Sequence, residues 1–171
     1  DLVRSRGLGD VYKRQDPRGR PEVYLGMKGI CYVELSASGA KRDLHSAWGT
    51  VVPNPAWRLV HALSTLKDRD ERVLIKGFYD NVRDPTERDL EVLRRMDFDI
   101  DGWREKFGLK QFLNNLSGMD FLVKHFFQPT CTICGMTSGY AGAGSKTVLP
   151  SEAVAKVDLR LVPDQDPKDI P

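Results

Sequence analysis

His45 is the residue in this chain whose type and surroundings best fit contact with a ligand or partner. It lies in Asp43-Leu44-His45-Ser46, with a carboxylate two residues before it and a hydroxyl directly after it. The segment falls between an expected strand and an expected helix, and loops held by rigid elements often carry binding and catalytic side chains. A solvated loop histidine would show the same local pattern, so His45 is a candidate and not yet a site.

Arg160 and Thr147 are two further candidates for contact with a substrate. Arg160 lies on the polar side of an alternating run with Lys156 and Asp158. A guanidinium there can bind a carboxylate through two parallel hydrogen bonds, or it can belong to a solvated charged face. Thr147 follows a glycine-rich segment, where its hydroxyl can bind a ligand or stabilise a turn.

The same glycine-rich segment partly matches the phosphate-binding pattern GxxxxGK[ST]. Gly139 and Gly144 have the required spacing, but Ser145 separates Gly144 from Lys146. In the phosphate-binding motif the lysine opens a helix, and Pro150 would break a helix that continued from Lys146. We therefore do not favour nucleotide binding.

Cys131 and Cys134 form a CxxC pair, which in other settings binds zinc or undergoes redox chemistry. The chain has no second such pair to complete four ligands. Three residues apart on a strand, the two side chains point to opposite faces, so we expect buried structural cysteines. Three cysteines are too few for a disulfide framework in 171 residues, which favours a reducing, cytoplasmic location.

Composition and charge exclude several classes of protein. With 40% hydrophobic and 29% charged residues, the chain is typical of a soluble globular domain, and no apolar stretch is long enough to cross a membrane. The net charge of +2 is matched by an excess of two basic residues within residues 1–15 alone. That segment resembles the translated read-through of a sequencing adapter, so we treat it as a non-native tail. The neutral remainder gives no basic surface for nucleic acid.

Hydrophobic periodicity predicts the elements that must position these residues. Alternation predicts strands ending at Ser38-Gly39 and covering residues 130–135 and 153–161, and a shorter β-prone run at 73–75. Asn54-Pro55 is a helix start, and Thr86 with Asp89 has the spacing of a capping box that opens a second helix. The apolar residues expected on the buried side of the first strand and of the first helix are Met27, Cys31, Val33 and Leu35, and Trp57, Leu59, Val60, Leu63 and Leu66.

Strands separated by one-sided helices predict an α+β fold, with a mainly antiparallel sheet and helices on one face. The stretch from Phe98 to Phe127 is expected to form short packed helices. Asp166-Pro167 has the features of a further helix start. We therefore expect the fold to be incomplete at its C-terminal end.

Several motifs, taken in order, resemble those of the zinc metallopeptidase family of carnosinase, aminoacylase and succinyl-diaminopimelate desuccinylase, in particular its carnosinase-like dipeptidase branch. The likeness runs from about Arg18 to the end of the chain. The residues that carry it are Asp43-Leu44-His45-Ser46, Asn54-Pro55, Gly77-Phe78-Tyr79-Asp80, Pro129-Thr130, Lys146-Thr147-Val148-Leu149-Pro150 and Arg160-Leu161-Val162-Pro163. The resemblance implies that residues 16–171 form the ferredoxin-like lid and dimerisation domain of such an enzyme, with an insertion.

In that family the lid is inserted into a catalytic domain that binds two zinc ions. The sequence contains neither His-x-Asp nor an adjacent Glu-Glu pair, so we expect this fragment to bind no metal and to be inactive alone. The resemblance implies a homodimer in which His45 reaches the other subunit's active site and donates a hydrogen bond to the carbonyl oxygen that becomes an oxyanion. It also implies that Thr147 and Arg160 contact a peptide or N-acyl amino-acid substrate, with Arg160 binding the terminal carboxylate.

A second hypothesis is a free-standing α+β module for dimerisation or small-molecule binding, without catalysis. The genomic sequence on both sides of the fragment separates the two hypotheses. A peptidase requires His-x-Asp upstream and a Glu-Glu pair before the lid.

Overall fold

The computed structural model describes residues 15–22 and 26–170, so the adapter-like tail, apart from Gln15, lies outside the described residues. The chain divides into two compact units, which we consider separately. Unit 2 combines Lys28–Arg83 with Pro129–Pro171. Unit 1 combines Asp84–Gln128 with the described residues up to Met27, so residues 84–128 form a unit apart from the sheet.

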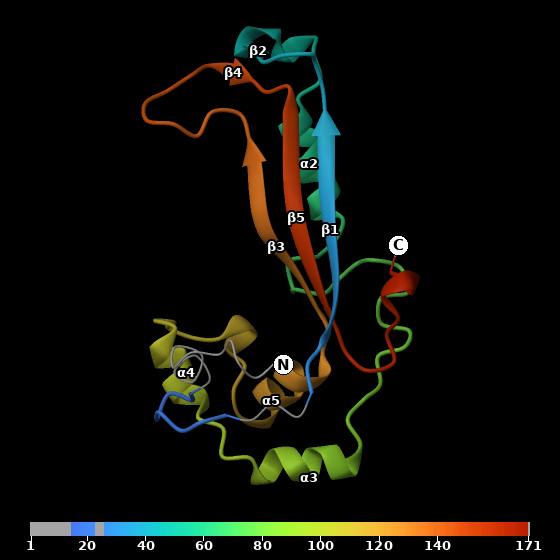
Figure 1. The fold of residues 1–171 in the computed structure, drawn as a ribbon, viewed down its shortest axis with the longest axis vertical. Helices are drawn as coiled ribbons and strands as arrows, with labels where there is room; N and C mark the ends of the chain where they lie inside the picture. The colour runs from blue at the N-terminus through green and yellow to red at the C-terminus, as the bar shows by residue number, and fades with distance from the viewer. Residues whose placement is uncertain (1–14, 23–25, 171) are drawn as a thin grey trace, which may run out of the picture. The chain divides into compact units, whose positions relative to one another are not determined.

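Unit 2 is built on a three-stranded antiparallel sheet (Figure 1). Its strands are β1 (Gly29–Ser38), β3 (Thr130–Ser138) and β5 (Glu152–Leu161), in the order β1-β5-β3. The predicted alternation is confirmed along β5, whose odd-numbered residues from Ala153 to Leu161 are all buried. Strand β3 runs past its predicted end at residue 135, because a β-bulge between Ile133 and Gly135 lets pairing with β5 resume.

Helix α2 (Pro55–Ser64) covers one face of this sheet. The predicted start is confirmed, since the Asn54 side chain accepts a hydrogen bond from the Ala56 N–H at 2.8 Å and Pro55 occupies the first turn. Leu59 is buried and packs against Ala153 and Ala155 of β5. The predicted α+β class, with an antiparallel sheet and a helix on one face, is therefore confirmed.

Three apolar residues expected on buried faces proved exposed, among them Val60 of α2, which is 38% exposed. Met27 is 92% exposed and precedes β1, and Trp57 lies on the solvent side of α2 with 63% exposure. In each case the apolar pattern extends past the surface that the sheet and helix cover. Gly39, which directly follows β1, leaves room for the start of α2, because a Cβ there would lie 2.8 Å from the Cγ of Pro55.

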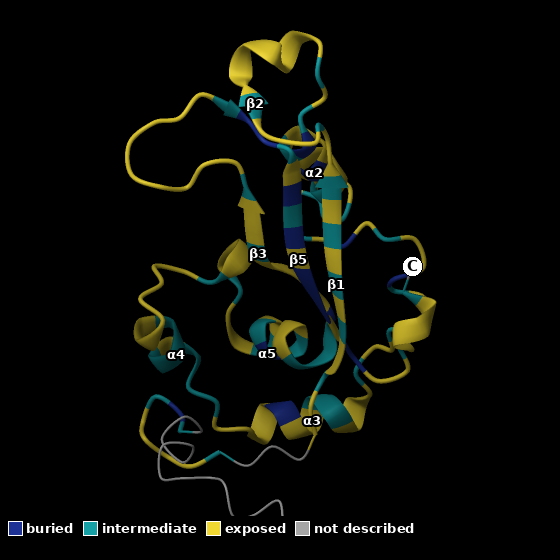
Figure 2. Ribbon diagram, turned by 45° about the horizontal axis from the view of Figure 1, so that its top comes forward, coloured by how far each residue is buried: buried dark blue, intermediate teal, exposed yellow. Residues whose placement is uncertain are grey.

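A second cluster of buried side chains lies along the same face, toward the C-terminal end of β5. Figure 2 shows the ribbon of this part of β5 in the colour of buried residues. Val73 and Phe78 pack there with Val157, Leu159 and Leu161. The β-prone run at residues 73–75 forms only an isolated bridge between Lys67 and Val73. After β5, Asp166 caps the short η3 helix (Pro167–Asp169), which confirms the predicted helix start.

Unit 1 consists mainly of short helices, as the mixed pattern of residues 98–127 predicted. They are α3 (Glu87–Arg95), α4 (Ile100–Lys106), η2 (Leu113–Asn115) and α5 (Gly118–Phe127). The capping box is confirmed, with the Asp89 N–H donating to Thr86 Oγ1 at 3.2 Å and the Thr86 N–H donating to Asp89 Oδ2 at 2.9 Å. Among the described residues, every helix is too short or too polar to cross a membrane.

Candidate functional site

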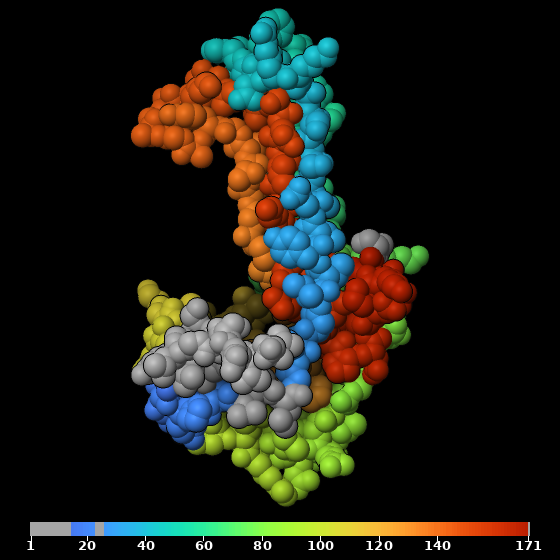
Figure 3. Space-filling view, viewed as in Figure 1, coloured from blue at the N-terminus to red at the C-terminus, as the bar shows by residue number. Residues whose placement is uncertain are grey.

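His45 is held at one end of unit 2 by a pair of very short strands. Strand β2 (Leu44–His45) pairs antiparallel with β4 (Val148–Leu149), placing His45 opposite Val148 and Leu44 opposite the buried Leu149. The sequence predicted a polar loop here, and this strand pairing is what the tertiary structure adds. In Figure 3 the teal atoms of the segment that contains β2 and the orange atoms of the segment before β4 lie at the same end of unit 2.

Asp43 ties the same two segments together. Its Oδ1 accepts hydrogen bonds from both the N–H and the hydroxyl of Ser151, each at 2.9 Å. These two hydrogen bonds lower the pKa of Asp43, so the carboxylate stays ionised as their acceptor. The bond joins residues far apart in sequence and fixes the backbone next to His45.

The imidazole ring of His45 has a defined orientation. As the N-cap of the η1 helix (Ser46–Thr50), its Nδ1 accepts a hydrogen bond from the Ala47 N–H at 3.1 Å. A nitrogen that accepts this bond carries no proton, so the neutral ring has its proton on Nε2. Nε2 lies 3.3 Å from Thr147 Oγ1, and the ring therefore presents an N–H donor beside a hydroxyl.

Thr147 reaches this position because it directly precedes β4. Its backbone oxygen also accepts the Ser46 N–H at 3.1 Å. The structure thus brings together two of the three residues that the sequence singled out. Lys146, the residue before Thr147, lies with its Nζ 5.9 Å from the Tyr140 ring centroid. Strand β4 begins two residues after it, whereas a phosphate-binding lysine would begin a helix.

Arg160 lies elsewhere in unit 2. It sits near the far end of β5, opposite Ile30 and Thr130, whereas the pair of His45 and Thr147 lies beyond Glu152 at the other end. At roughly 3.3 Å per residue, Glu152 and Arg160 are about 26 Å apart along the strand. A single copy of the chain therefore does not bring Arg160 to His45.

The side chain of Arg160 is paired with Asp158, one of the two residues with which it could have formed a solvated charged face. Its Nε lies 3.0 Å from Asp158 Oδ1, and Asp158 is only 8% exposed. The alternation of charges in the sequence indicated that both side chains share a face. It gave no sign that one of them would be buried.

The two cysteines of the CxxC pair differ in exposure. Cys131 is buried, as expected, but Cys134 is exposed, so the prediction of two buried cysteines is wrong for Cys134. Strand β3 is at the sheet edge and carries its bulge at this position, which leaves Cys134 uncovered. Across the described part of the chain, no three His, Cys, Asp or Glu side chains cluster so that they could hold a metal ion.

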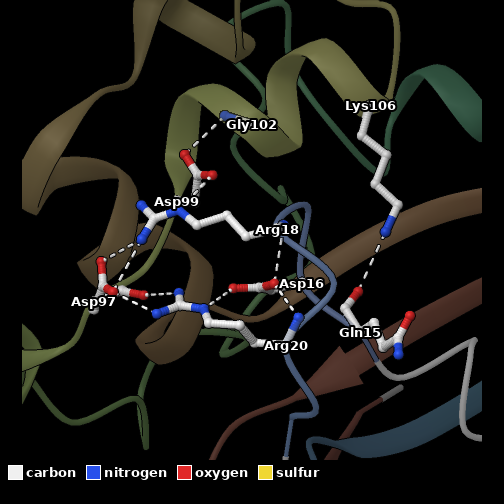
Figure 4. Close-up of polar contacts among 8 residues, drawn as sticks. All are labelled: Gln15, Asp16, Arg18, Arg20, Asp97, Asp99, Gly102 and Lys106. Atoms are coloured by element: carbon white, nitrogen blue, oxygen red, sulfur yellow. Dashed lines mark hydrogen bonds and ion pairs between the residues drawn. The ribbon is translucent and has the colours of Figure 1, made fainter.

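Unit 1 contains a polar cluster that the sequence analysis missed (Figure 4). Arg18 binds Asp97 and Asp99, each at 3.0 Å, and Arg20 Nε donates to the buried Asp16 at 2.6 Å. Burial raises the pKa of Asp16, but hydrogen bonds from Arg20 and Arg18 outweigh it and hold the pKa below its ordinary value. The acidic run Asp97-Phe98-Asp99 was the available signal, but its arginine partners lie almost eighty residues earlier.

Next to this cluster is a cavity of about 730 Å³. Its walls are largely aromatic and include Phe98, Trp103, Phe112, Phe121 and Phe126. The arginines of the cluster fasten the segment that carries Asp16 and Pro21 over one side of it. The aromatic residues here were predicted to pack, and their rings do contact one another, with the centroids of Phe112 and Phe121 4.6 Å apart, while they also line the cavity.

Comparison with known proteins identifies the domain. A family model described as a peptidase dimerisation domain matches residues 25–170. A Cys-Gly metallodipeptidase from Candida albicans is 30% identical over 150 residues, covering 87% of this chain and 31% of the relative. A Beta-Ala-His dipeptidase from Rattus norvegicus is 27% identical over 150 residues, covering 86% of this chain and 30% of the relative.

A solved structure supports the same assignment. An M20 family metallo-carboxypeptidase from Sulfolobus solfataricus is 42% identical, with a TM-score of 0.82, over 91% of this chain and 40% of that chain. The chain spans about a third of the length of the curated relatives it matches. The resemblance drawn from the sequence motifs is confirmed, and the chain belongs to the family of M20 peptidase dimerisation domains.

Proposed function

We propose that this chain is the lid and dimerisation part of a metal-dependent peptidase that acts on dipeptides or similar small amides. Two of the matched relatives are named dipeptidases and a third is named a metallo-carboxypeptidase. The observation that carries the proposal within this chain is the His45 ring, whose orientation leaves Nε2–H as a donor beside the Thr147 hydroxyl. We expect it to act in a homodimer.

Amide hydrolysis places negative charge on the carbonyl oxygen as water adds. A hydrogen-bond donor already aimed at that oxygen stabilises the transition state more than the substrate, because the charge is larger in the transition state. His45 suits this role since its Nδ1 is engaged by the Ala47 N–H. The hydrogen bond to Nδ1 therefore sets the tautomer of the ring before the substrate binds.

The surface around His45 supports insertion into another subunit. Trp48, which belongs to η1, is 56% exposed, and Val51, which directly follows η1, is 71% exposed. Large apolar side chains grouped on a surface mark sites of protein contact. In a homodimer these side chains would be covered as His45 enters the partner's site, and water would be excluded around the donor.

The distance between Arg160 and His45 supports a shared site. A dipeptide is about 7 Å long, much shorter than the separation of roughly 26 Å along β5. His45 and Arg160 of one copy of the chain therefore cannot contact the same dipeptide. In a two-fold symmetric dimer, His45 and Thr147 of one subunit would meet Arg160 of its partner at each active site.

The metal ions of such an enzyme have no ligand set among the described residues, and the Nδ1 of His45 is already engaged. We therefore assign no step through a metal to this chain. Two zinc ions and a cytoplasmic location remain predictions. The roles proposed for this chain's own residues are donation to the oxyanion by His45, support from Thr147, and binding of the terminal carboxylate by Arg160.

The test uses the intact protein encoded by the full gene. His45→Ala should lower kcat on Cys-Gly or Beta-Ala-His by about 10²–10³-fold, the usual loss when one oxyanion donor is removed. His61→Ala is the matched control, since it removes a histidine that stacks on Trp57 of α2. Metal content and dimerisation should be unchanged in both variants.

Two results would contradict the proposal. Equal kcat in His45→Ala and wild type would remove His45 from the mechanism. If the intact protein hydrolyses no dipeptide with any divalent metal added, the second hypothesis of a binding module replaces the peptidase.

A further inference from the structure

Asp158 and Arg160 form an unusual pair on the face of the sheet opposite α2. They are two residues apart on β5, so both side chains lie on the same face. Asp158 is 8% exposed, whereas half of the Arg160 side chain is exposed. A buried carboxylate thus lies under an arginine that solvent and ligands can reach.

Apart from Arg160, the residues paired with Asp158 across the sheet offer no charge that would offset the cost of burying its carboxylate. Its neighbours across the sheet are Tyr32 on β1 and Thr132 on β3, neither of which carries a charge. Its Oδ1 is buried and has no partner in hydrogen-bonding geometry, so the contact with Arg160 is an ion pair. Burying a carboxylate is costly, and an apolar side chain would serve packing alone at lower cost. This indicates that the charge of Asp158 acts on Arg160.

The contact is made through Nε of the guanidinium. Among the described residues, the structure gives the terminal nitrogens of Arg160 no hydrogen bond or ion pair. A carboxylate can bind a guanidinium through two nitrogens at once, with strict geometry. Arg160 is therefore restrained at Nε while the Nη1 and Nη2 pair stays available.

We propose that Asp158 is a positioning residue that holds Arg160 in the orientation required to bind the terminal carboxylate of the peptide substrate. This inference rests on the proposed function. Asp158 would act through Arg160 and would not touch the substrate. Its loss should therefore weaken substrate binding and leave the chemical step intact.

If Asp158 positions Arg160, its removal should change KM in the direction opposite to that expected from charge alone. Removal of the negative charge of Asp158 makes the site more positive, which by itself would lower KM for a substrate carboxylate. Loss of the restraint on Arg160 raises KM, because the flexible side chain must then be ordered by the substrate. The electrostatic gain is the smaller effect, since charges at a half-exposed site are screened.

The experiment compares a dipeptide with the same dipeptide amidated at its C-terminus, using the intact peptidase. Asp158→Asn keeps the size of the side chain and removes its charge. It should raise KM for the free dipeptide about tenfold or more, with kcat changed less than about threefold, and leave KM for the amide unchanged. Asp158→Ala should do the same, and it serves if the asparagine variant does not fold.

Two controls separate positioning from a general structural role. Lys156→Gln removes a charge from the same face of β5 and should change neither substrate's KM. In an Arg160→Gln background, Asp158→Asn should have no further effect on KM, because its action passes through Arg160. A structural role would lower kcat and Tm alike and affect both substrates.

Unchanged or lowered KM for the free dipeptide in both Asp158 variants would overturn the inference while leaving the peptidase proposal intact. A similar rise in KM for the free and amidated dipeptides would also overturn it. Absence of any hydrolysis by the wild-type enzyme would refute the proposed function itself, and the inference with it.

Discussion

A mixture of two variants that each have low activity should recover activity if each active site is shared between subunits. His45→Ala removes the proposed oxyanion donor, and Arg160→Ala removes the proposed carboxylate ligand. Each homodimer should be nearly inactive, the first through a fall in kcat of about 10²–10³-fold and the second mainly through a rise in KM. Arg160 lies near the C-terminal end of β5 and His45 lies in β2, beyond the other end of β5, so each substitution leaves the other residue's surroundings untouched.

The expected recovery follows from geometry. A heterodimer of the two variants has one site that combines intact His45 with intact Arg160, and one site that lacks both. Random association makes half of the dimers heterodimers with one working site in two, so activity should return to about a quarter of wild type. If one subunit supplied both residues to its own site, every site would carry one defect and no activity would return.

The assay measures hydrolysis of a dipeptide after the variants are co-expressed, or unfolded together and refolded. Size-exclusion chromatography gives the dimer fraction, and differently tagged subunits give the heterodimer fraction. Activity that stays at the level of the parent variants, with heterodimers present, would refute the shared site. It would also refute the reasoning that the separation of about 26 Å requires two subunits.

Two further predictions concern stability. Leu149→Ala should destabilise unit 2 by about 2–5 kcal/mol, since Leu149 is 2% exposed and anchors the strand next to Thr147; urea unfolding measures this, and a loss under 1 kcal/mol would contradict it. In unit 1, hydrogen bonds from Arg20 and Arg18 lower the pKa of Asp97. This stabilisation is complete above the ordinary carboxyl pKa of about 3.9 and is lost as the pH falls through the lower folded-state value. Acid unfolding followed by circular dichroism should therefore be less steep in Asp97→Asn, and an unchanged acid transition would count against it.

Local pattern in the sequence was sufficient for the elements whose signals are short-range. The Asn54-Pro55 start, the capping box of Thr86 and Asp89, and the alternation along β5 were all confirmed. Each depends on backbone geometry and on side chains within a few residues, which the sequence contains directly. The family motifs were recognisable for the same reason, because they are short and occur in a fixed order.

Contacts between distant residues were decided only by the tertiary structure. Asp43 meets Ser151, and Arg18 meets Asp97 and Asp99, across separations of about eighty residues or more. No local periodicity encodes such pairs, because they depend on which strands and loops come together when the chain folds. The exposure of Cys134 likewise depended on a bulge at a sheet edge. The position of that bulge is set by how β3 pairs with β5.

The sequence by itself determined the fold class, the family and the candidates His45, Thr147 and Arg160. The tertiary structure decided how these residues are arranged. It places Thr147 beside His45, leaves Nε2 of the ring as the donor by engaging Nδ1, and sets Arg160 at the far end of the central strand beside a buried carboxylate. The physical reason is that hydrogen-bond partners and strand pairing are properties of the folded chain, whereas residue type and spacing belong to the sequence.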